Sequence, residues 1–256
     1  MNISYGFIED IGLRGSMEDS HAIWQVPEKM FFSAEIYDGH GGKRAAQIAA
    51  EMLTPCFLKL WEGEAEKPLK KRRGEAELLR QAYTDVDDHI LNAGVKSGTT
   101  SATFYVIDKR YIVSNAGDTR VIIGTKAGAD LLTLDHKPSL SEERSRIEKS
   151  GGFISGYGTP RVQGVLAVSR ALGDAGLKPF VISDPRIVEG LLEKDNDFVI
   201  LACDGIWDVL IPQEVIDIAR SAESPQEGAR QIKDRALDYG STDNISVIVI
   251  DLRDYL

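Results

Sequence analysis

The sequence predicts an α+β fold, a two-sheet sandwich of largely antiparallel strands with helices packed outside. Three observations lead to this prediction. Segments rich in β-branched and aromatic residues come in runs, segments with helical periodicity come in pairs, and the two kinds do not alternate regularly. A doubly wound parallel sheet would require that alternation. We find no internal repeat and no interdomain linker, so we expect a single domain over residues 1–256.

The predicted strands share Val, Ile, Phe, Tyr and Thr and are bounded by Gly, Asp, Asn or Pro. Their number is enough for two sheets. They lie at residues 3–8, 20–26, 30–37, 99–107, 110–116, 119–124, 130–134, 165–168, 187–189, 197–203 and 244–251.

Five segments have the spacing of amphipathic helices. Residues 43–61 and 75–93 carry apolar side chains on one face, and Pro55 can bend the first of them. The last two predicted helices each begin with a proline, which suits the first turn of a helix. The remaining three helices are predicted at residues 141–150, 212–220 and 225–239.

Composition narrows the class of protein. A hydrophobic content of 43% and a charged content of 27% are those of an ordinary globular chain. The formal net charge of -10 argues against nucleic acid as the main partner. No apolar run approaches the roughly 20 residues of a membrane span, and the first residues do not resemble a signal peptide. We therefore expect no nucleic-acid partner and no membrane partner.

The two cysteines, Cys56 and Cys203, lie far apart in apolar surroundings. We interpret them as reduced thiols instead of a disulfide or a metal site. With no signal peptide, this predicts a cytoplasmic protein. Nothing indicates an oligomer interface, so we expect a monomer.

Four aspartates stand at the ends of predicted strands. Asp38, Asp118 and Asp204 each follow a strand, and Asp243 directly precedes the last one. If these ends share one edge of a sheet, the carboxylates form a cluster that only cations can stabilise. The acidic pair Glu18-Asp19, between the first two strands, is available to join them.

The donor types favour a hard divalent cation. Zinc would require closely spaced His or Cys residues, and the four histidines show no such spacing. Carboxylates and backbone carbonyls suit Mg²⁺ or Mn²⁺. Gly39 lacks a side chain next to Asp38, so its carbonyl can turn toward a metal.

Two such ions about 3.5–4 Å apart are a known device for hydrolysing phosphate esters through an activated water. The phosphate also needs a cationic fork, for which Arg14 is a candidate. An alkoxide leaves poorly unless it is protonated, and His40 is placed to act as the general acid.

In combination these residues match a family. The chain resembles protein phosphatases of the 2C type, the metal-dependent PPM family of serine/threonine phosphatases. The matching segments run nearly end to end. They are Arg14-x-x-Met17-Glu18-Asp19, Tyr37-Asp38-Gly39-His40-Gly41-Gly42, Ser97-Gly98-Thr99-Thr100, Asn115-Ala116-Gly117-Asp118-Thr119-Arg120, Asp135-His136-Lys137-Pro138, Leu166-Ala167-Val168-Ser169-Arg170-Ala171-Leu172-Gly173-Asp174, Leu201-Ala202-Cys203-Asp204-Gly205-Ile206-Trp207-Asp208 and Asp243-Asn244.

The resemblance implies a sandwich flanked on both sides by helix pairs, with two metal ions at one end. It makes Asp38 the bridging carboxylate and Gly39 a carbonyl ligand. Glu18 matches a ligand on one side of the pair. Asp204 and Asp243 match ligands on the other side.

Further roles follow from the same resemblance. Asp118, together with Asp204, matches the position of a third, weaker metal. Arg14 matches the phosphate-binding arginine and His40 the general acid. Asp19 matches a second-shell or water-mediated position.

Residues 137–161 match a flap beside the active site. His136 and Lys137 are expected to be structural at its base. Arg170 and Asp174 are expected in an internal hydrogen-bond network, and Trp207 in the core. Nothing after the last strand suggests a further helical region, so we expect a bare catalytic domain.

The leading hypothesis is hydrolysis of phosphoserine and phosphothreonine in proteins with Mn²⁺ or Mg²⁺. Two alternatives stay open. One is a binding module that keeps the fold but not the activity, and the other is a phosphatase of small metabolites. The basic run 67–73 is most simply a solvated loop between two helices, and a docking or targeting patch is the alternative.

Overall fold

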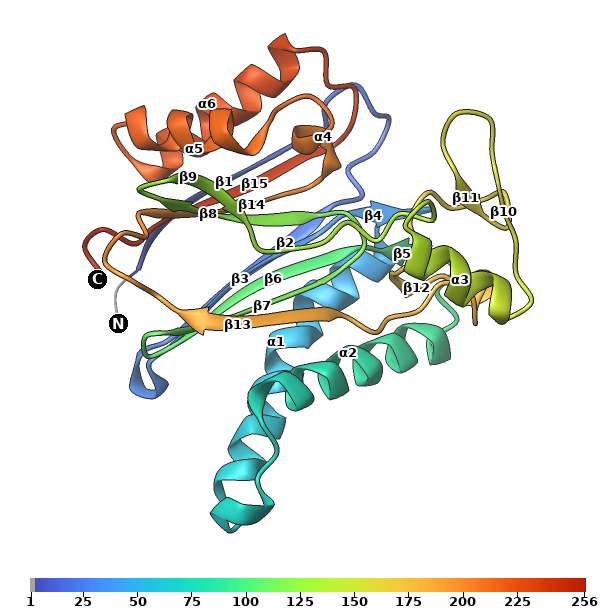
Figure 1. Cartoon of the computed structure of the whole chain (residues 1–256), viewed down its shortest axis with the longest axis horizontal. Helices are drawn as coiled ribbons and strands as arrows, with labels where there is room; N and C mark the ends of the chain where they lie inside the picture. The colour runs from blue at the N-terminus through green and yellow to red at the C-terminus, as the bar shows by residue number, and fades with distance from the viewer. Residues whose placement is uncertain (1–2) are drawn as a thin grey trace.

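A computed structural model describes residues 3–256 of the chain. Two five-stranded sheets lie face to face and a pair of helices covers each outer face (Figure 1). Helices α1 (Arg44–Ala65) and α2 (Glu75–Asn92) cover one sheet. Helices α5 (Pro212–Ser221) and α6 (Pro225–Asp238) cover the other. The predicted α+β class is confirmed.

Neighbouring strands in both sheets are antiparallel. The first sheet has the order β1-β15-β14-β8-β9 and the second the order β13-β7-β6-β3-β2. The first contains β1 (Ser4–Asp10), β8 (Arg120–Thr125), β9 (Gly128–Leu131), β14 (Phe198–Ala202) and β15 (Ile245–Asp251). The second contains β2 (Ser20–Val26), β3 (Phe31–Tyr37), β6 (Ser101–Ile107), β7 (Arg110–Ala116) and β13 (Arg186–Leu191).

Shorter elements gather at one end of the sandwich, on the right in Figure 1. A small sheet has the order β12-β5-β4, and β10 and β11 form a separate hairpin. A single turn of helix, α4, follows β14. The bounds are β4 (Gly39–His40), β5 (Gly98–Thr99), α3 (Ser141–Lys149), β10 (Ile154–Ser155), β11 (Arg161–Val162), β12 (Leu172–Gly173) and α4 (Asp204–Trp207).

Alternation along the strands builds three layers of core. In β3, Phe32 and Ile36 face the other sheet, whereas Phe31 and Tyr37 face the helices α1 and α2. The outer face of the first sheet packs in the same way on α5 and α6. This period of two is what a strand covered on both faces requires.

Three predicted strands differ from the structure. The strand predicted at 99–107 is divided into β5 and β6, which belong to different sheets. Residues 165–168 form a turn, in which Leu166 pairs with Val162 alone, because Gln163 and Gly164 adopt positive φ and fold the chain back. The strand predicted at 130–134 becomes β9 and ends at Leu131. Beyond it the Thr133 hydroxyl, not a backbone carbonyl, accepts from the Val121 N–H. Helix α1 continues through Pro55.

A polar network is buried between β3 and α1. The Glu35 carboxylate accepts hydrogen bonds from the hydroxyl of Tyr37, at 2.5 Å, and from that of Thr54. The hydroxyls of Ser33 and Tyr105 lie 3.2 and 2.7 Å from that of Thr54. Burial raises the pKa of Glu35 to about 7, against the hydrogen bonds that lower it. Glu35 is therefore a proton-binding group of the folded state.

This raised pKa predicts a pH-dependent contribution to stability. Between its unfolded value of 4.5 and its folded value of about 7, Glu35 holds a proton only when the chain is folded. The contribution of Glu35 to the free energy of unfolding is therefore fully present below pH 4.5 and is lost as the pH rises through about 7. The difference in unfolding free energy between wild type and Glu35→Gln should fall by about 3 kcal/mol over this interval. Urea unfolding in EDTA at several pH values measures it, and parallel pH profiles would contradict it.

Candidate active site

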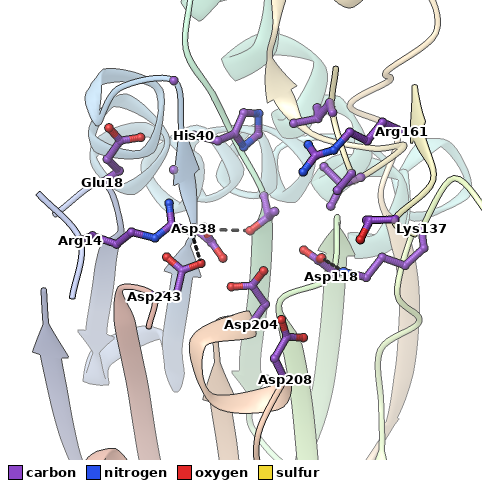
Figure 2. A pocket seen from close by; sticks show the side chains of 17 residues that line it. Arg14, Glu18, Asp38, His40, Asp118, Lys137, Arg161, Asp204, Asp208 and Asp243 are labelled. Atoms are coloured by element: carbon purple, nitrogen blue, oxygen red, sulfur yellow. Dashed lines mark hydrogen bonds and ion pairs between the residues drawn. The ribbon is translucent and has the colours of Figure 1, made fainter. Parts of the chain in front are cut away.

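A pocket of about 380 Å³ opens at the end of the sandwich where the short elements gather. Figure 2 shows carboxylates from both sheets pointing into it, with cationic side chains at its margins. The titratable residues that line it are Arg14, Glu18, Asp38, His40, Asp118, Lys137, Arg161, Asp204, Asp208 and Asp243.

Strand topology brings the four strand-end aspartates together. Strands β3 and β7 are parallel because each pairs antiparallel with β6, so Asp38 and Asp118 follow strands that end at the same edge. Strands β14 and β15 are antiparallel neighbours, so the end of one and the start of the other bring in Asp204 and Asp243. All four line the same pocket, as the shared-edge argument requires.

A loop before β2 adds Glu18. The amide of Asn244 fixes this loop, since its Nδ2 donates to the carbonyls of Ile11 and Ser16 and its Oδ1 accepts from the Glu18 N–H at 2.9 Å. Gly39 lies against the same loop. A Cβ on Gly39 would come 2.1 Å from the Glu18 carbonyl oxygen. Only glycine lets these two candidate ligands approach so closely.

Burial and mutual repulsion disfavour ionisation of the cluster. Burial raises the pKa of Asp38 well above its usual range, and Asp204 adds the largest of the repulsive contributions. Burial and the charges of Asp118 and Asp243 raise the pKa of Asp204 to about 7. Asp19 lies behind the pocket, where Ser246 donates to its Oδ2 at 2.7 Å, and burial raises its pKa to about 6. A cation close to these carboxylates would favour their ionised form and lower their pKa values.

Two side chains of the protein already supply cations. The Arg14 guanidinium lies 2.5 Å from Asp243 Oδ2, and the Lys137 ammonium forms an ion pair with Asp118 (Figure 2). Lys137 was expected to be structural at the base of the flap. The structure places Lys137 among the residues that line the pocket, and its structural role stays a prediction.

The donor set fits a hard divalent cation. It consists of carboxylates and the Gly39 region of the backbone, with no thiolate and a single imidazole. In residues 3–256, no three His, Cys, Asp or Glu side chains stand in an arrangement that could hold an ion as they are. Asp243 and Asp118 are turned toward Arg14 and Lys137. Binding of cations therefore requires these side chains to change partner.

His40 is held by a carboxylate that sequence reasoning assigned only to an internal network. Its Nε2 lies 2.7 Å from Oδ2 of Asp174, which is buried. The small sheet creates this contact, because β5 pairs with both β4 and β12, and Asp174 follows β12. A Cβ on Gly98 would come 2.1 Å from the Asp174 carboxylate, so glycine is needed there as well.

Three other residues of the site were missed. Asp208 and Arg161 line the pocket, and Asn244 holds the Glu18 loop. Asp208 lies four residues after Asp204, so the helical turn of α4 was a signal that could have revealed it. Asn244 is positioned by contacts distant in sequence, with Ile11, Ser16 and Glu18. Arg161 is positioned locally, by the β10–β11 hairpin and by donation to the Val165 carbonyl.

The remaining residues singled out from the sequence lie outside the pocket. His136 is buried, where its Nδ1 accepts from the Gly117 N–H and burial lowers its pKa to about 4. Arg170 donates to Glu143, and Trp207 packs in the core. Cys56 and Cys203 are both free thiols, as predicted.

Comparison with known proteins identifies relatives of the whole chain. Residues 3–245 match the family model of protein phosphatase 2C. The probable protein phosphatase 2C 59 of Arabidopsis thaliana is 37% identical over 253 residues, which cover 96% of this chain and 79% of that protein. The probable protein phosphatase 2C member 13 of Oryza sativa subsp. japonica, named as mitochondrial, is 36% identical over 96% of this chain and 67% of that protein.

A solved structure shows the same fold. The serine-threonine phosphatase 2C of Toxoplasma gondii superposes with a TM-score of 0.86 and 21% sequence identity, covering 97% of this chain and 94% of that one.

The carboxylate cluster predicts an unusual effect of Asp204→Asn. Without metal, the substitution removes a charge whose ionisation in the folded state is costly, so it should stabilise the protein on the order of 2 kcal/mol at pH 8. The gain should shrink toward pH 5, because Asp204, with its pKa raised to about 7, is then protonated. Denaturant unfolding in EDTA measures the gain.

The same variant should lose stabilisation by metal. Added Mn²⁺ should raise the melting temperature of the wild type more than that of Asp204→Asn. A variant that is less stable than wild type in EDTA at pH 8 would contradict the repulsion argument.

Proposed function

Because the chain belongs to the protein phosphatase 2C family and is a metal-dependent protein serine/threonine phosphatase, we propose that the pocket between the sheet ends is its active site. One observation carries the proposal. Six carboxylates from five separate segments converge with Arg14 and His40 on a single cavity. Crowding of this kind costs stability in the absence of cations, so it is best explained by function.

We infer that two Mn²⁺ or Mg²⁺ ions bind here, with a third, weaker site beside them. Asp38 would serve both ions and the Gly39 carbonyl would be a further ligand, with Glu18 on one side and Asp204 and Asp243 on the other. Asp118 would share the third site with Asp204. Asp19 would contact the ions through a water molecule or through their ligands. When bound, the ions supply a nucleophilic water at neutral pH and offset charge on the phosphoryl oxygens.

The side chains of Arg14 and Lys137 would change partners when metal ions bind. Once the charge of Asp243 is neutralised, the Arg14 guanidinium is released from its 2.5 Å ion pair and can bind phosphate oxygens in a bidentate manner. More than half of the Arg14 side chain is exposed, so it can turn without disturbing the core. Lys137 gains the same freedom when Asp118 changes partner.

His40 would deliver the proton to the leaving serine or threonine oxygen. A carboxylate only accepts hydrogen bonds, so the Asp174 contact assigns the proton on Nε2. When the ring carries both protons, as an imidazolium, Nδ1 is the nitrogen that can donate its proton to the leaving group and return to the neutral form. Asp174 fixes the orientation of the ring during this transfer.

Residues 137–161 would form a flap beside the pocket within one catalytic domain. Lys137, Thr159 and Arg161 line the pocket. The hairpin of β10 and β11 lies at the same end of the sandwich as the other short elements (Figure 1). No helix within residues 3–256 is long and apolar enough to cross a membrane. A monomer located in the cytoplasm and acting on phosphorylated proteins, without a nucleic-acid partner, stays our prediction from the sequence.

Metal loading and turnover test the proposal together. Wild type should hydrolyse a phosphothreonine peptide with Mn²⁺ and stop in EDTA, and calorimetric titration should count at least two ions. Asp38→Asn should bind fewer ions and lose at least about a hundredfold in kcat, because its carboxylate would be a ligand of both ions. Asp130→Asn, an exposed aspartate on β9, is the matched control. Full activity of Asp38→Asn would refute the assigned site.

Leaving-group dependence tests His40 and Asp174. His40→Ala should lose about a hundredfold on a phosphothreonine peptide, whose alkoxide needs a proton, and little on p-nitrophenyl phosphate. Asp174→Asn should show the same selectivity with a smaller loss, because the ring keeps a weaker partner. Equal losses on both substrates would remove the pair from proton transfer.

A further inference from the structure

The basic run 67–73 is not explained by the active site. It forms the connection between α1 and α2 and includes the short 3-10 turn η2 (Leu69–Lys71). In Figure 1 this connection lies at the far end of the helical hairpin, away from the short elements around the pocket. The Leu69 side chain in this turn is 80% exposed. We call residues 61–73 the hairpin tip.

Ion pairing at the hairpin tip leaves an excess of positive charge. Glu64 is paired with both Lys67 and Arg73. Two more acidic residues are paired with cations from outside the tip: Glu62, within the tip, with Lys29, and Glu75, just beyond it, with Arg110.

The unpaired cations of the tip are Lys70, Lys71 and Arg72. Arg72 donates only to the backbone carbonyls of Lys67 and Ala65. In the described part of the chain, none of the three has a carboxylate partner, and the tip contains one acidic residue that is in no ion pair, Glu66. On a chain of net charge -10 this is a local surplus of the opposite sign.

A hollow of about 480 Å³ adjoins Arg72, one of these three cations. Its walls also include Trp61 and Ala65. The other charged residues of its walls are Glu62, Glu64 and Glu75, each in an ion pair, and their partners Lys29 and Arg73. Trp61 is anchored from below, because its ring stacks on Phe57 at 6.3 Å and lies 6.4 Å from Phe31. An anchored aromatic beside an arginine is the composition of a protein-binding hot spot.

We propose that the hairpin tip is a docking site for an acidic segment of phosphoprotein substrates, separate from the catalytic pocket. The unpaired cations would attract the acidic side chains, and Trp61 would receive an apolar residue among them. Anionic membranes are recruited by clusters of about four to eight basic residues, more than the tip has left unpaired. A peptide is therefore the favoured occupant. The proposal rests on the phosphatase activity of the chain.

Geometry sets a minimum length for such a substrate. Helix α1 starts beside the pocket, just after Gly41 and Gly42, and its 22 residues end at the tip. At 1.5 Å per residue, the helix separates the two sites by about 33 Å. An extended peptide covers about 3.3 Å per residue, so at least about ten residues must separate the phosphorylated residue from the acidic segment. Docking then raises the effective concentration of the phosphate at the pocket.

The test uses Lys70→Ala with Lys71→Ala, since both side chains are exposed and in no ion pair. The matched control is Lys126→Ala with Lys194→Ala, two exposed lysines outside the tip. Substrates are phosphothreonine peptides carrying four glutamates either four or fifteen residues from the phosphate, on each side, and p-nitrophenyl phosphate. The tip variant should raise KM about fivefold for the fifteen-residue spacing alone, with kcat unchanged. The effect should vanish at 0.5 M NaCl.

Binding without catalysis gives a second readout. A fluorescent acidic peptide without phosphate should bind metal-free wild type and the control variant more tightly than the tip variant. Unchanged KM on every peptide would overturn the proposal, as would tip-dependent binding to phosphatidylserine vesicles without any effect on peptides. If wild type does not hydrolyse p-nitrophenyl phosphate, the proposed catalytic site is refuted instead. Failure of the docking proposal and failure of the proposed function are therefore distinguishable.

Discussion

The structure depends on one constraint, the repulsion among carboxylates that both sheets bring to a common edge. Asp38, Asp118, Asp204 and Asp243 come from strands distant in sequence, so their crowding is a property of the topology. Burial strengthens the repulsion, because it removes the water that would screen it. Arg14 and Lys137 offset part of this repulsion, because they form ion pairs with the two outer members of the cluster, Asp243 and Asp118. Within residues 3–256, no cationic side chain forms an ion pair with the inner members, Asp38 and Asp204.

In the proposed function, this arrangement would link metal loading to substrate recognition. Arg14 is paired with Asp243 in the structure, and a metal ion beside Asp243 would free the guanidinium for phosphate. The same guanidinium would then stabilise the metal-free fold and afterwards bind the substrate. The supports are rigid, since Asn244 ties the Glu18 loop to β15 and the small sheet ties His40 to Asp174. Changes of partner are therefore confined to side chains.

Sequence reasoning predicted the parts of this site that follow local rules. Asp38, Asp118 and Asp204 were found because each ends an apolar strand, and their meeting followed from strand pairing. The contact of Asp174 with His40 was missed, since it depends on a sheet of two-residue strands with no hydrophobic pattern. The strand predicted at 165–168 was wrong for a related reason. The segment does contain the apolar residues typical of a strand. However, the positive φ of Gln163 turns the chain, and amino-acid composition does not reveal this turn.

Helix α1 gives the molecule a fixed length scale. The segment that contributes Asp38, Gly39 and His40 leads directly into α1, and the aromatic cluster of Phe31, Phe57 and Trp61 packs the far end of that helix on the sheet. Pro55 does not interrupt the helix, because packing of both faces outweighs the lost hydrogen bond. The distance from pocket to tip is thus set by a packed element, not by a loop. A surface charge at the tip can then select substrates by the spacing of their residues, while the pocket selects them by their phosphate.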